Sequence, residues 1–180
     1  MTKYISFLRG INVGGKRKIL MSDLKKLYEH LGYSNITTYI QSGNVIFDFD
    51  KKINTRQLEN EIQNSIFENY GFDVPVMIRS ISEMKQSIAS NPFRKTGNIE
   101  QLHLTFLKEN PDPDKLENIK KFEYPPDKFI IDNKYVFILF SGKSSDSKLT
   151  NSFFEKKLNV QATNRNWKTV NKLFEIATNY

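Results

Sequence analysis

The sequence contains no cysteine, which excludes disulfide bridges and thiolate metal sites. It has two histidines, His30 and His103, and no acidic pair at the spacing of metal ligands. We therefore expect neither a metal nor a cofactor. Each histidine falls within a predicted helix or strand, where a structural role is the simpler interpretation. No serine is paired with a histidine in a recognisable motif, so a covalent nucleophile is not expected.

Long apolar runs are also missing. The longest, YVFILF (Tyr135–Phe140), is far shorter than the roughly 20 residues that span a bilayer. The N-terminal segment carries Lys3 and Arg9 without a long apolar stretch, so a signal peptide is not expected. We expect a soluble, cytoplasmic protein that does not engage a membrane. Hydrophobic residues make up 38% of the chain and aromatic residues 13%, enough for a packed core.

Basic residues outnumber acidic ones, 27 to 20, which gives a formal net charge of +7. This balance permits a polyanionic or phosphorylated partner. The lysines are nevertheless spread along the chain in short groups at 16–18, 25–26, 120–121 and 156–157. A generally basic, solvated surface explains this distribution equally well.

The first half alternates strands and helices in the order β-α-β-β-α-β. Strands are predicted at 4–9, 36–40, 45–49 and 74–79, and helices at 22–31 and from about 55 to 70. Ser22 is the expected N-cap of the first helix, and Gly32 the expected residue after its end. Pro75 cannot donate to a strand ladder, which predicts that the fourth strand lies at a sheet edge.

The second half repeats this order of elements. Ser80 and Glu83 have the spacing of a capping box for a connecting helix, and 91–98 is a linker. Strands are predicted at 102–107, 128–132, 135–140 and 159–163, and helices at 111–122, 149–158 and 164–178. We recognise no repeat at the level of residues.

The predicted fold class is α+β, an α/β sandwich of two ferredoxin-like β-α-β-β-α-β halves with antiparallel sheets and an additional C-terminal helix. The predicted domain bounds are 1–80 for the first half, 81–100 for the connecting helix and linker, and 101–180 for the second half.

RGINVGGK (Arg9–Lys16) has nearly the spacing of a nucleotide-binding phosphate loop. Arg17 stands where that loop needs a hydroxyl for Mg²⁺, and the following helix begins several residues late. A nucleotide hydrolase is therefore not expected. Two interpretations remain: a basic, glycine-bearing loop that binds an anion, and a glycine turn that only joins strand to helix.

QSGN (Gln41–Asn44) is predicted to join two strands, since Gly43 and Asn44 tolerate left-handed backbone. Its amides and hydroxyl could also face a ligand. The stretch SGNVIFDF (Ser42–Phe49) weakly matches an RNA-binding strand, with Phe47 and Phe49 on one face. SGKSSDSK (Ser141–Lys148) is predicted to be a polar loop, with anion binding as its alternative.

TNRNWKT (Thr163–Thr169) is a further concentrated polar cluster. Thr163, Asn164 or Asn166 is expected to cap the last helix. Arg165 and Lys168 would then place positive charge in its first turn, against the helix dipole, which hints at an anionic partner. The single tryptophan, Trp167, could stack on a base, although a core position is favoured.

With these three motifs, the chain resembles the family of domains of unknown function numbered 1697, small bacterial proteins of about this length. The resemblance implies two ferredoxin-like halves and no established activity. The residues that match the family's motifs are Arg9, Gly10, Asn12, Gly14, Gly15, Tyr39, Gln41, Ser42, Gly43, Asn44, Lys148, Leu149, Thr163, Arg165, Asn166, Trp167 and Thr169.

The leading functional hypothesis is binding of an anionic ligand, a nucleic acid or a phosphorylated small molecule, by loops that converge in one cleft. The alternatives are a metal-independent small-molecule enzyme without a covalent nucleophile and an interaction module without chemistry. No catalytic constellation is recognisable, and the oligomeric state is open. The candidate ligand-binding residues are Arg9, Asn12, Gly14, Gly15, Lys16, Gln41, Ser42, Asn44, Lys148, Arg165, Asn166, Trp167 and Thr169.

Overall fold

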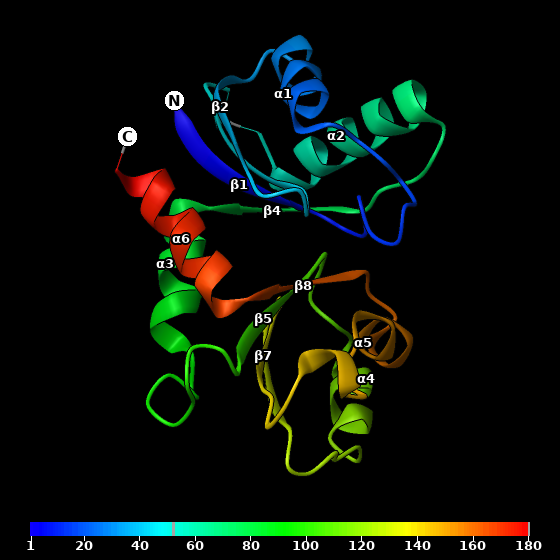
Figure 1. The fold of residues 1–180 in the computed structure, drawn as a ribbon, viewed down its shortest axis with the longest axis vertical. Coiled ribbons are helices and arrows are strands. Elements are labelled where there is room, and N and C mark those ends of the chain that lie inside the picture. Colours follow the sequence, from blue (N-terminus) through cyan, green and yellow to red (C-terminus); the bar gives the residue numbers. More distant parts are fainter. Residues whose placement is uncertain (52, 180) are drawn as a thin grey trace. The chain divides into compact units, whose positions relative to one another are not determined.

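The computed structural model describes residues 1–51 and 53–179. The chain divides into two compact units: unit 1 comprises Met1–Gln86 with Leu173–Tyr180, and unit 2 comprises Ser87–Lys172. Each unit contains one four-stranded sheet (Figure 1). The domain bounds expected from the sequence stay a prediction.

Unit 1 has the strand order β2-β3-β1-β4, with every neighbouring pair antiparallel. Its elements are β1 (Thr2–Leu8), α1 (Met21–His30), β2 (Ser34–Tyr39), β3 (Asn44–Phe49), α2 (Thr55–Tyr70) and β4 (Val76–Ser80), followed by α3 (Ile81–Ser90). This order confirms the ferredoxin-like pattern. The fourth strand is an edge strand as predicted, and it begins immediately after Pro75.

Unit 2 repeats the arrangement in the order β6-β7-β5-β8, again antiparallel throughout. Its elements are β5 (Leu102–Leu107), α4 (Pro113–Ile119), β6 (Lys128–Asp132), β7 (Tyr135–Leu139), the short 3₁₀ turn η1 (Ser144–Asp146), α5 (Asn151–Leu158), β8 (Ala162–Asn166) and α6 (Trp167–Thr178). The fold class predicted from the sequence is therefore confirmed.

The local sequence accounts for both ends of α2 and for the end of α1, but not for the start of α1. Asn54 accepts a hydrogen bond from the backbone of Arg56 at the start of α2, and Gly71 ends that helix with φ +73°. Gly32, at φ +82°, follows the end of α1, as predicted. Ser22 is not the N-cap that was predicted: α1 begins one residue before it, at Met21, and the N-cap residue Leu20 makes no side-chain cap.

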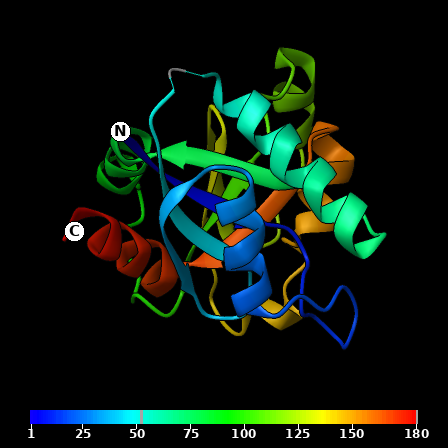
Figure 2. The same ribbon diagram turned by 90° about the horizontal axis from the view of Figure 1, so that it is seen from above.

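The core of unit 1 lies between the sheet and the helices α1 and α2, as the views in Figures 1 and 2 agree. Leu24 of α1, Leu58 of α2 and Phe47 of β3 are all fully buried in one hydrophobic cluster. Phe49 is buried in the same cluster. The suggested match to an RNA-binding strand is therefore wrong, because rings used for base stacking must be exposed.

The junction of β8 and α6 differs from the prediction. β8 pairs with β5 through Arg165 and Asn166, so these residues belong to a strand and α6 begins at Trp167. Asn166 accepts a hydrogen bond from the backbone of Thr169 at 2.8 Å, which makes it the cap among the predicted alternatives. Arg165 is consequently outside the first helical turn, and the dipole argument for an anionic partner does not apply to it.

This junction reveals a repeat between the halves that the sequence analysis missed. Arg79 and Arg165 each occupy the fourth position of the last strand of their unit. Each guanidinium is buried and donates to the carbonyl of the residue before it at 2.8 Å. Ser80 and Asn166 follow them and cap α3 and α6 through the residue three positions on. The predicted capping box of Ser80 and Glu83 is confirmed.

Candidate functional site

The glycine loop after β1 forms a small β-hairpin that projects from unit 1 (Figure 2). Val13 and Lys16 form a bridge, and the backbone of Asn12 donates to the carbonyl of Arg17 at 3.2 Å. Gly14 and Gly15 are the two turn residues, with φ of +58° and +74°. Positive φ at both central positions is the requirement of a type I′ turn, which explains the glycine pair.

Asn12 holds this hairpin in place. Its side chain exchanges hydrogen bonds with both the N–H and the C=O of Ile19, each at 2.9 Å. The same amide donates to the carbonyl of Gln41 at 2.9 Å, which ties the hairpin to the turn between β2 and β3. The predicted first and second motifs are thus brought together, and Asn12 positions them.

The turn between β2 and β3 is packed under the loop after β1. The backbone of Leu8 donates to the carbonyl of Gly43 at 2.8 Å. A Cβ on Gly43 would lie 2.7 Å from Cβ of Leu8 and 2.8 Å from Cδ1 of Ile11, so only glycine fits there. Asn44 is fully buried, and its amide donates to the carbonyl of Tyr39 and to Oγ of Ser42. It therefore closes the turn from inside.

We call residues 9–18 and 40–44 the hairpin–turn surface. Lys16, Lys18 and the side chain of Gln41 are exposed on it, and Arg9 and Arg17 are half-buried. Val13 is 64% exposed and Ile40 is 50% exposed. Ile40 also has φ +50°, a strained conformation for a β-branched residue. Positive charge, hydrogen-bond donors and exposed apolar groups thus stand side by side.

The predicted residues of the third motif are placed differently. Arg165, Trp167 and Thr169 are buried, and burial lowers the pKa of Arg165 to about 10. Nη1 of Arg165 also donates to Oγ1 of Thr163 at 2.8 Å. Lys168 in the first turn of α6 forms an ion pair with Glu100. These contacts give the third motif a structural role in unit 2, and the shared cleft stays a prediction.

Lys148 is separated from Arg165 by the sheet of unit 2. Its ammonium lies 5.6 Å from the ring centroid of Tyr124, which packs against the core under α4 and α5. Arg165 lies opposite Leu104 on β5, and successive residues of a strand alternate between faces. Ala162, three positions before Arg165, belongs to the core under the helices, so Arg165 projects from the other face.

The polar loop 141–148 is anchored beside Tyr124 by Asp127. Oδ1 accepts from the backbone and the hydroxyl of Ser141 at 2.8 and 2.9 Å, and Oδ2 accepts from the hydroxyl of Ser147 at 2.6 Å. Desolvation alone would raise the pKa of Asp127, but these three hydrogen bonds outweigh it and lower the pKa. The loop is thus held by a carboxylate, in keeping with the simpler of its two interpretations.

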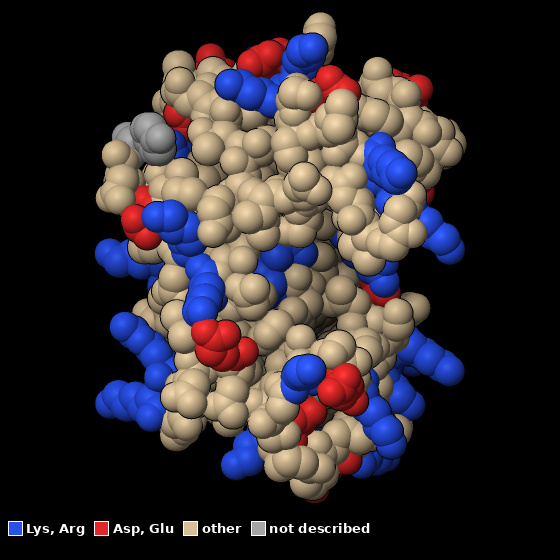
Figure 3. Space-filling view, in the orientation of Figure 1, with Lys and Arg blue, Asp and Glu red and all other residues tan. Residues whose placement is uncertain are grey.

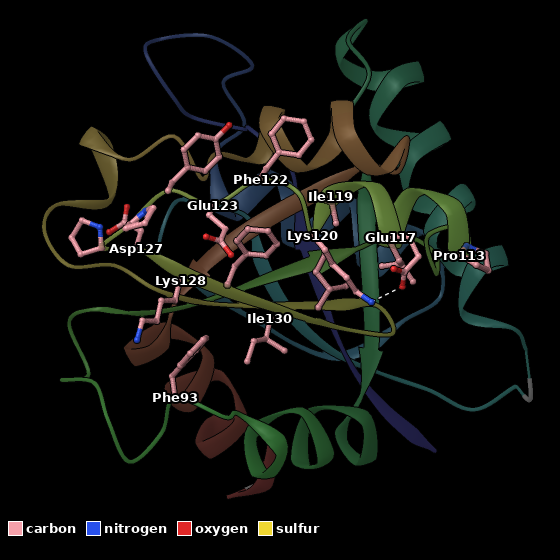
Figure 4. Close-up of a pocket in the computed structure, with 16 residues that line it drawn as sticks. Phe93, Pro113, Glu117, Ile119, Lys120, Phe122, Glu123, Asp127, Lys128 and Ile130 are labelled. Atoms are coloured by element: carbon pink, nitrogen blue, oxygen red, sulfur yellow. Dashed lines mark hydrogen bonds and ion pairs between the residues drawn. The ribbon is translucent and has the colours of Figure 1, made fainter.

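Unit 2 contains a cavity of about 860 Å³ that the sequence analysis did not anticipate (Figure 4). Its walls are α4, the segment from Phe122 to Asp127, strand β6 and Phe93. The lining is mostly apolar. One signal in the sequence was available: in KFIID (Lys128–Asp132), Ile130 falls on the outward face, where a polar residue is the expectation, and it is 45% exposed.

Figure 3 shows basic side chains distributed over both units on the face in view, with acidic side chains among them. Within residues 1–51 and 53–179, no cluster of three histidine, aspartate or glutamate side chains is placed to hold a metal ion. No helix in the described part of the chain has both the length and the apolar composition needed to cross a membrane.

Comparisons with known proteins agree with this architecture. The sequence model of a family described as "Protein of unknown function (DUF1697)" matches residues 1–137, a range that ends before the third motif. Curated proteins give no match. Among solved structures, the chain is similar to the conserved bacterial protein SP0830 from Streptococcus pneumoniae, with 25% identity and a TM-score of 0.77, over 98% of this chain and 99% of that chain.

Proposed function

Because the chain belongs to the DUF1697 family, whose description names no activity, we propose a function from the geometry of unit 1. The hairpin–turn surface binds an anionic ligand, a nucleic acid or a phosphorylated small molecule. The chemistry available there is positive charge and hydrogen-bond donation. This chemistry suits recognition of phosphate.

The observation that carries the proposal is the coupling of an exposed basic hairpin to a strained turn through Asn12. A joining loop has no need of a left-handed isoleucine that is half exposed, and such strain concentrates at binding sites. Gly43 allows the close approach that fixes the turn against the loop after β1. The surface is thus built before any ligand arrives, which lowers the entropic cost of binding.

Within the class of anions, the exposure of the site favours a nucleic acid. Lys16 and Lys18 lie on a projecting hairpin, where an extended phosphate backbone can reach both. Val13, which bridges to Lys16, and Ile40, which precedes Gln41 in the turn, are exposed on the same hairpin–turn surface and offer apolar contact to an unstacked base. A nucleotide or another phosphorylated small molecule would use the same ammonium groups without this contact.

The test is binding of a fluorescently labelled single-stranded oligonucleotide, followed by anisotropy at several salt concentrations. We expect the logarithm of affinity to fall linearly with the logarithm of salt concentration. Replacing Lys16 and Lys18 together by alanine should weaken binding at least about tenfold and reduce the slope by about 1 to 2. The double variant Lys25→Ala/Lys26→Ala, on α1 of the same unit, removes the same charge and should change binding less.

A thermal-shift series with inorganic pyrophosphate and nucleotides separates the two ligand types, because any ligand that binds only the native state raises the midpoint. A shift with nucleotides but no oligonucleotide binding would assign the site to phosphorylated small molecules. No binding of either type at low salt would refute the proposal. Equal losses in the two lysine double variants would show that general charge, rather than the hairpin, attracts the anion.

A further inference from the structure

Strand β6 is the edge strand of the unit 2 sheet, and it pairs with β7 through a two-residue turn at Asn133 and Lys134. The residues that close such a turn, Asp132 and Tyr135, are a hydrogen-bonded pair. Hydrogen-bonded and non-hydrogen-bonded pairs alternate along an antiparallel ladder, so Ile130 and Lys128 also bond to β7. The N–H and C=O groups of Phe129 and Ile131 therefore point outward.

The corresponding strand of unit 1 is protected against further pairing, whereas β6 is not. In β2 the register shifts between Ser34 and Thr37, and Asn35 has φ +50°. Such a bulge interrupts the edge and prevents association with another strand. The register of β6 with β7 is continuous over all five residues, and the strand contains no proline. No strand in the described part of the chain pairs with its outer side.

The sequence of β6 is complementary to itself when two copies run antiparallel about Ile130. Lys128 then faces Asp132 of the second copy, and Asp132 faces its Lys128. Phe129 of each copy faces Ile131 of the other. The backbone N–H and C=O groups of both residues point outward, so each of the two Phe129–Ile131 pairs can exchange two hydrogen bonds. Ile130 meets itself on the two-fold axis. Lysine, isoleucine and aspartate project to the same face, as Figure 4 shows for Lys128 and Ile130.

The cavity beside β6 provides the apolar surface that strand pairing alone lacks. Phe129 and Ile131 pack toward the helix side of the sheet, and the cavity continues there along Leu116 of α4 and Phe122. The same residues of a second copy would arrive from across the axis on the same side of the sheet. On the other face, Phe93 and Ile130 line the cavity and would meet the second Ile130.

We propose that this protein forms a two-fold symmetric homodimer in which β6 pairs antiparallel with β6 of a second copy, joining the two unit 2 sheets into one continuous sheet. The interface is isologous, since one patch serves both partners. Opposite charges at both ends of the strand fix the register, because a slip by two residues would separate both Lys128–Asp132 pairs.

The experiment measures molar mass by light scattering after size exclusion, at loading concentrations from about 1 to 200 µM, a range suited to a small interface. We expect the mass to approach that of a dimer as concentration rises. Lys128→Asp and Asp132→Lys each place like charges opposite one another, and each variant should be monomeric. The control Lys143→Asp makes the same charge change in the loop after β7 and should remain dimeric.

Mixing the Lys128→Asp and Asp132→Lys variants is the decisive experiment. In the mixed pair every charge again faces its opposite, so a heterodimer should form from two monomeric variants, and the double variant Lys128→Asp/Asp132→Lys should dimerise alone. Ile130→Lys, which brings two ammonium groups together on the axis, should also be monomeric. A wild-type protein that stays monomeric at the highest concentration would overturn the proposal. An extended segment of another protein would then be the alternative partner of the β6 edge. A dimer that is insensitive to Lys128→Asp would overturn it equally.

Discussion

Of the glycines in the hairpin–turn surface, Gly43 leaves the least room for a Cβ atom. Its φ is +77°, and a Cβ would approach Leu8 to 2.7 Å and Ile11 to 2.8 Å. We expect Gly43→Ala to lower the free energy of unfolding by about 2 to 4 kcal/mol, because left-handed strain adds to a clash with the core.

Gly14→Ala is the matched control for this prediction. Gly14 has φ +58°, and nothing lies within 4 Å of the position of its Cβ. Only the backbone strain remains, so the expected loss is about 1 kcal/mol. Urea unfolding of both variants gives the comparison, and equal losses would mean that the close approach of Gly43 contributes nothing to stability.

His103 gives the folded state a dependence on pH. It lies in a network in which Asn164 donates to Oγ1 of Thr105 at 2.9 Å. The oxygen of the same amide lies 2.7 Å from Nδ1 of His103, which must therefore donate. Burial lowers the pKa of His103 below its ordinary value of 6.5, although the bond to Asn164 acts in the opposite direction.

Because the folded-state pKa is the lower one, the unfolded chain binds this proton first as pH falls. The stability due to neutral His103 is complete above pH 6.5 and decreases as pH falls from 6.5 toward the folded-state pKa. We expect His103→Gln to reduce the difference in urea midpoint between about pH 7.5 and pH 5. An unchanged difference in the His103 variant would contradict this origin of the pH dependence.

At the residue scale, the sequence indicated what each residue type can do and not which neighbour it meets. The pair Gly14 and Gly15 predicts a turn by itself, since both need left-handed backbone. The role of Asn12 was not accessible, because its partner Gln41 lies 29 residues away. Asn44 looked suited to a ligand because polar residues in a turn are usually exposed. In the structure its side chain is fully buried, and its amide donates to the carbonyl of Tyr39 within the turn.

The loop 141–148 is an element whose order depends on one carboxylate. Asp127 accepts hydrogen bonds from Ser141 and Ser147, at both ends of the loop. Asp127→Asn turns one acceptor into a donor, and we expect a loss of about 1 to 3 kcal/mol. Faster cleavage of the loop in limited proteolysis should accompany it. Asp146→Asn in the same loop is the control, since Asp146 accepts only from its neighbour Ser145 among the contacts described.

Acid should remove this difference. The pKa of Asp127 is lowered in the folded state, so its contribution is present above the ordinary value of 3.8 and is lost as pH falls through the lowered pKa. The wild type and Asp127→Asn should therefore approach one another in stability as pH falls below 3.8. A difference that stays constant as the protein is acidified further would mean that the charge of Asp127 is not what holds the loop.

At the element scale, the sequence predicted existence and order well and boundaries less well. β8 was placed at 159–163, yet it runs from Ala162 to Asn166. Its residues ATNRN have weak strand propensity, and pairing with β5 selects them. At the start of α1 the local signal was favourable but was not used. Ser22 has the side chain of an N-cap, yet the helix already includes Met21 before it.

For the whole molecule, the duplicated β-α-β-β-α-β pattern was readable because each half carries its own periodicity and its own turn residues. Pro75 identified an edge strand, and the structure places β4 at the edge. The cavity along β6 was not predicted, because it is formed by α4, the segment after it and Phe93 together. Nor could the sequence show that the last residues of α6 group with the first half of the chain.

This grouping leads to a prediction for the whole chain. α6 begins in unit 2, but Leu173–Tyr180 belong to unit 1, where Leu173 and Ala177 are buried. A chain that ends at Lys172 loses this apolar contribution, and burial of a leucine alone is worth about 2 to 3 kcal/mol. We expect the truncated protein to exchange amide hydrogens faster in β1–β4 and to retain protection in β5–β8.

A chain that ends at Thr178 keeps both buried residues and should exchange like the complete protein. The milder variant Leu173→Ala should show the same selectivity at a cost of about 2 to 5 kcal/mol. Equal acceleration in both sheets would contradict the assignment of the C-terminal turns to unit 1, because the effect would then belong to the molecule as one cooperative body.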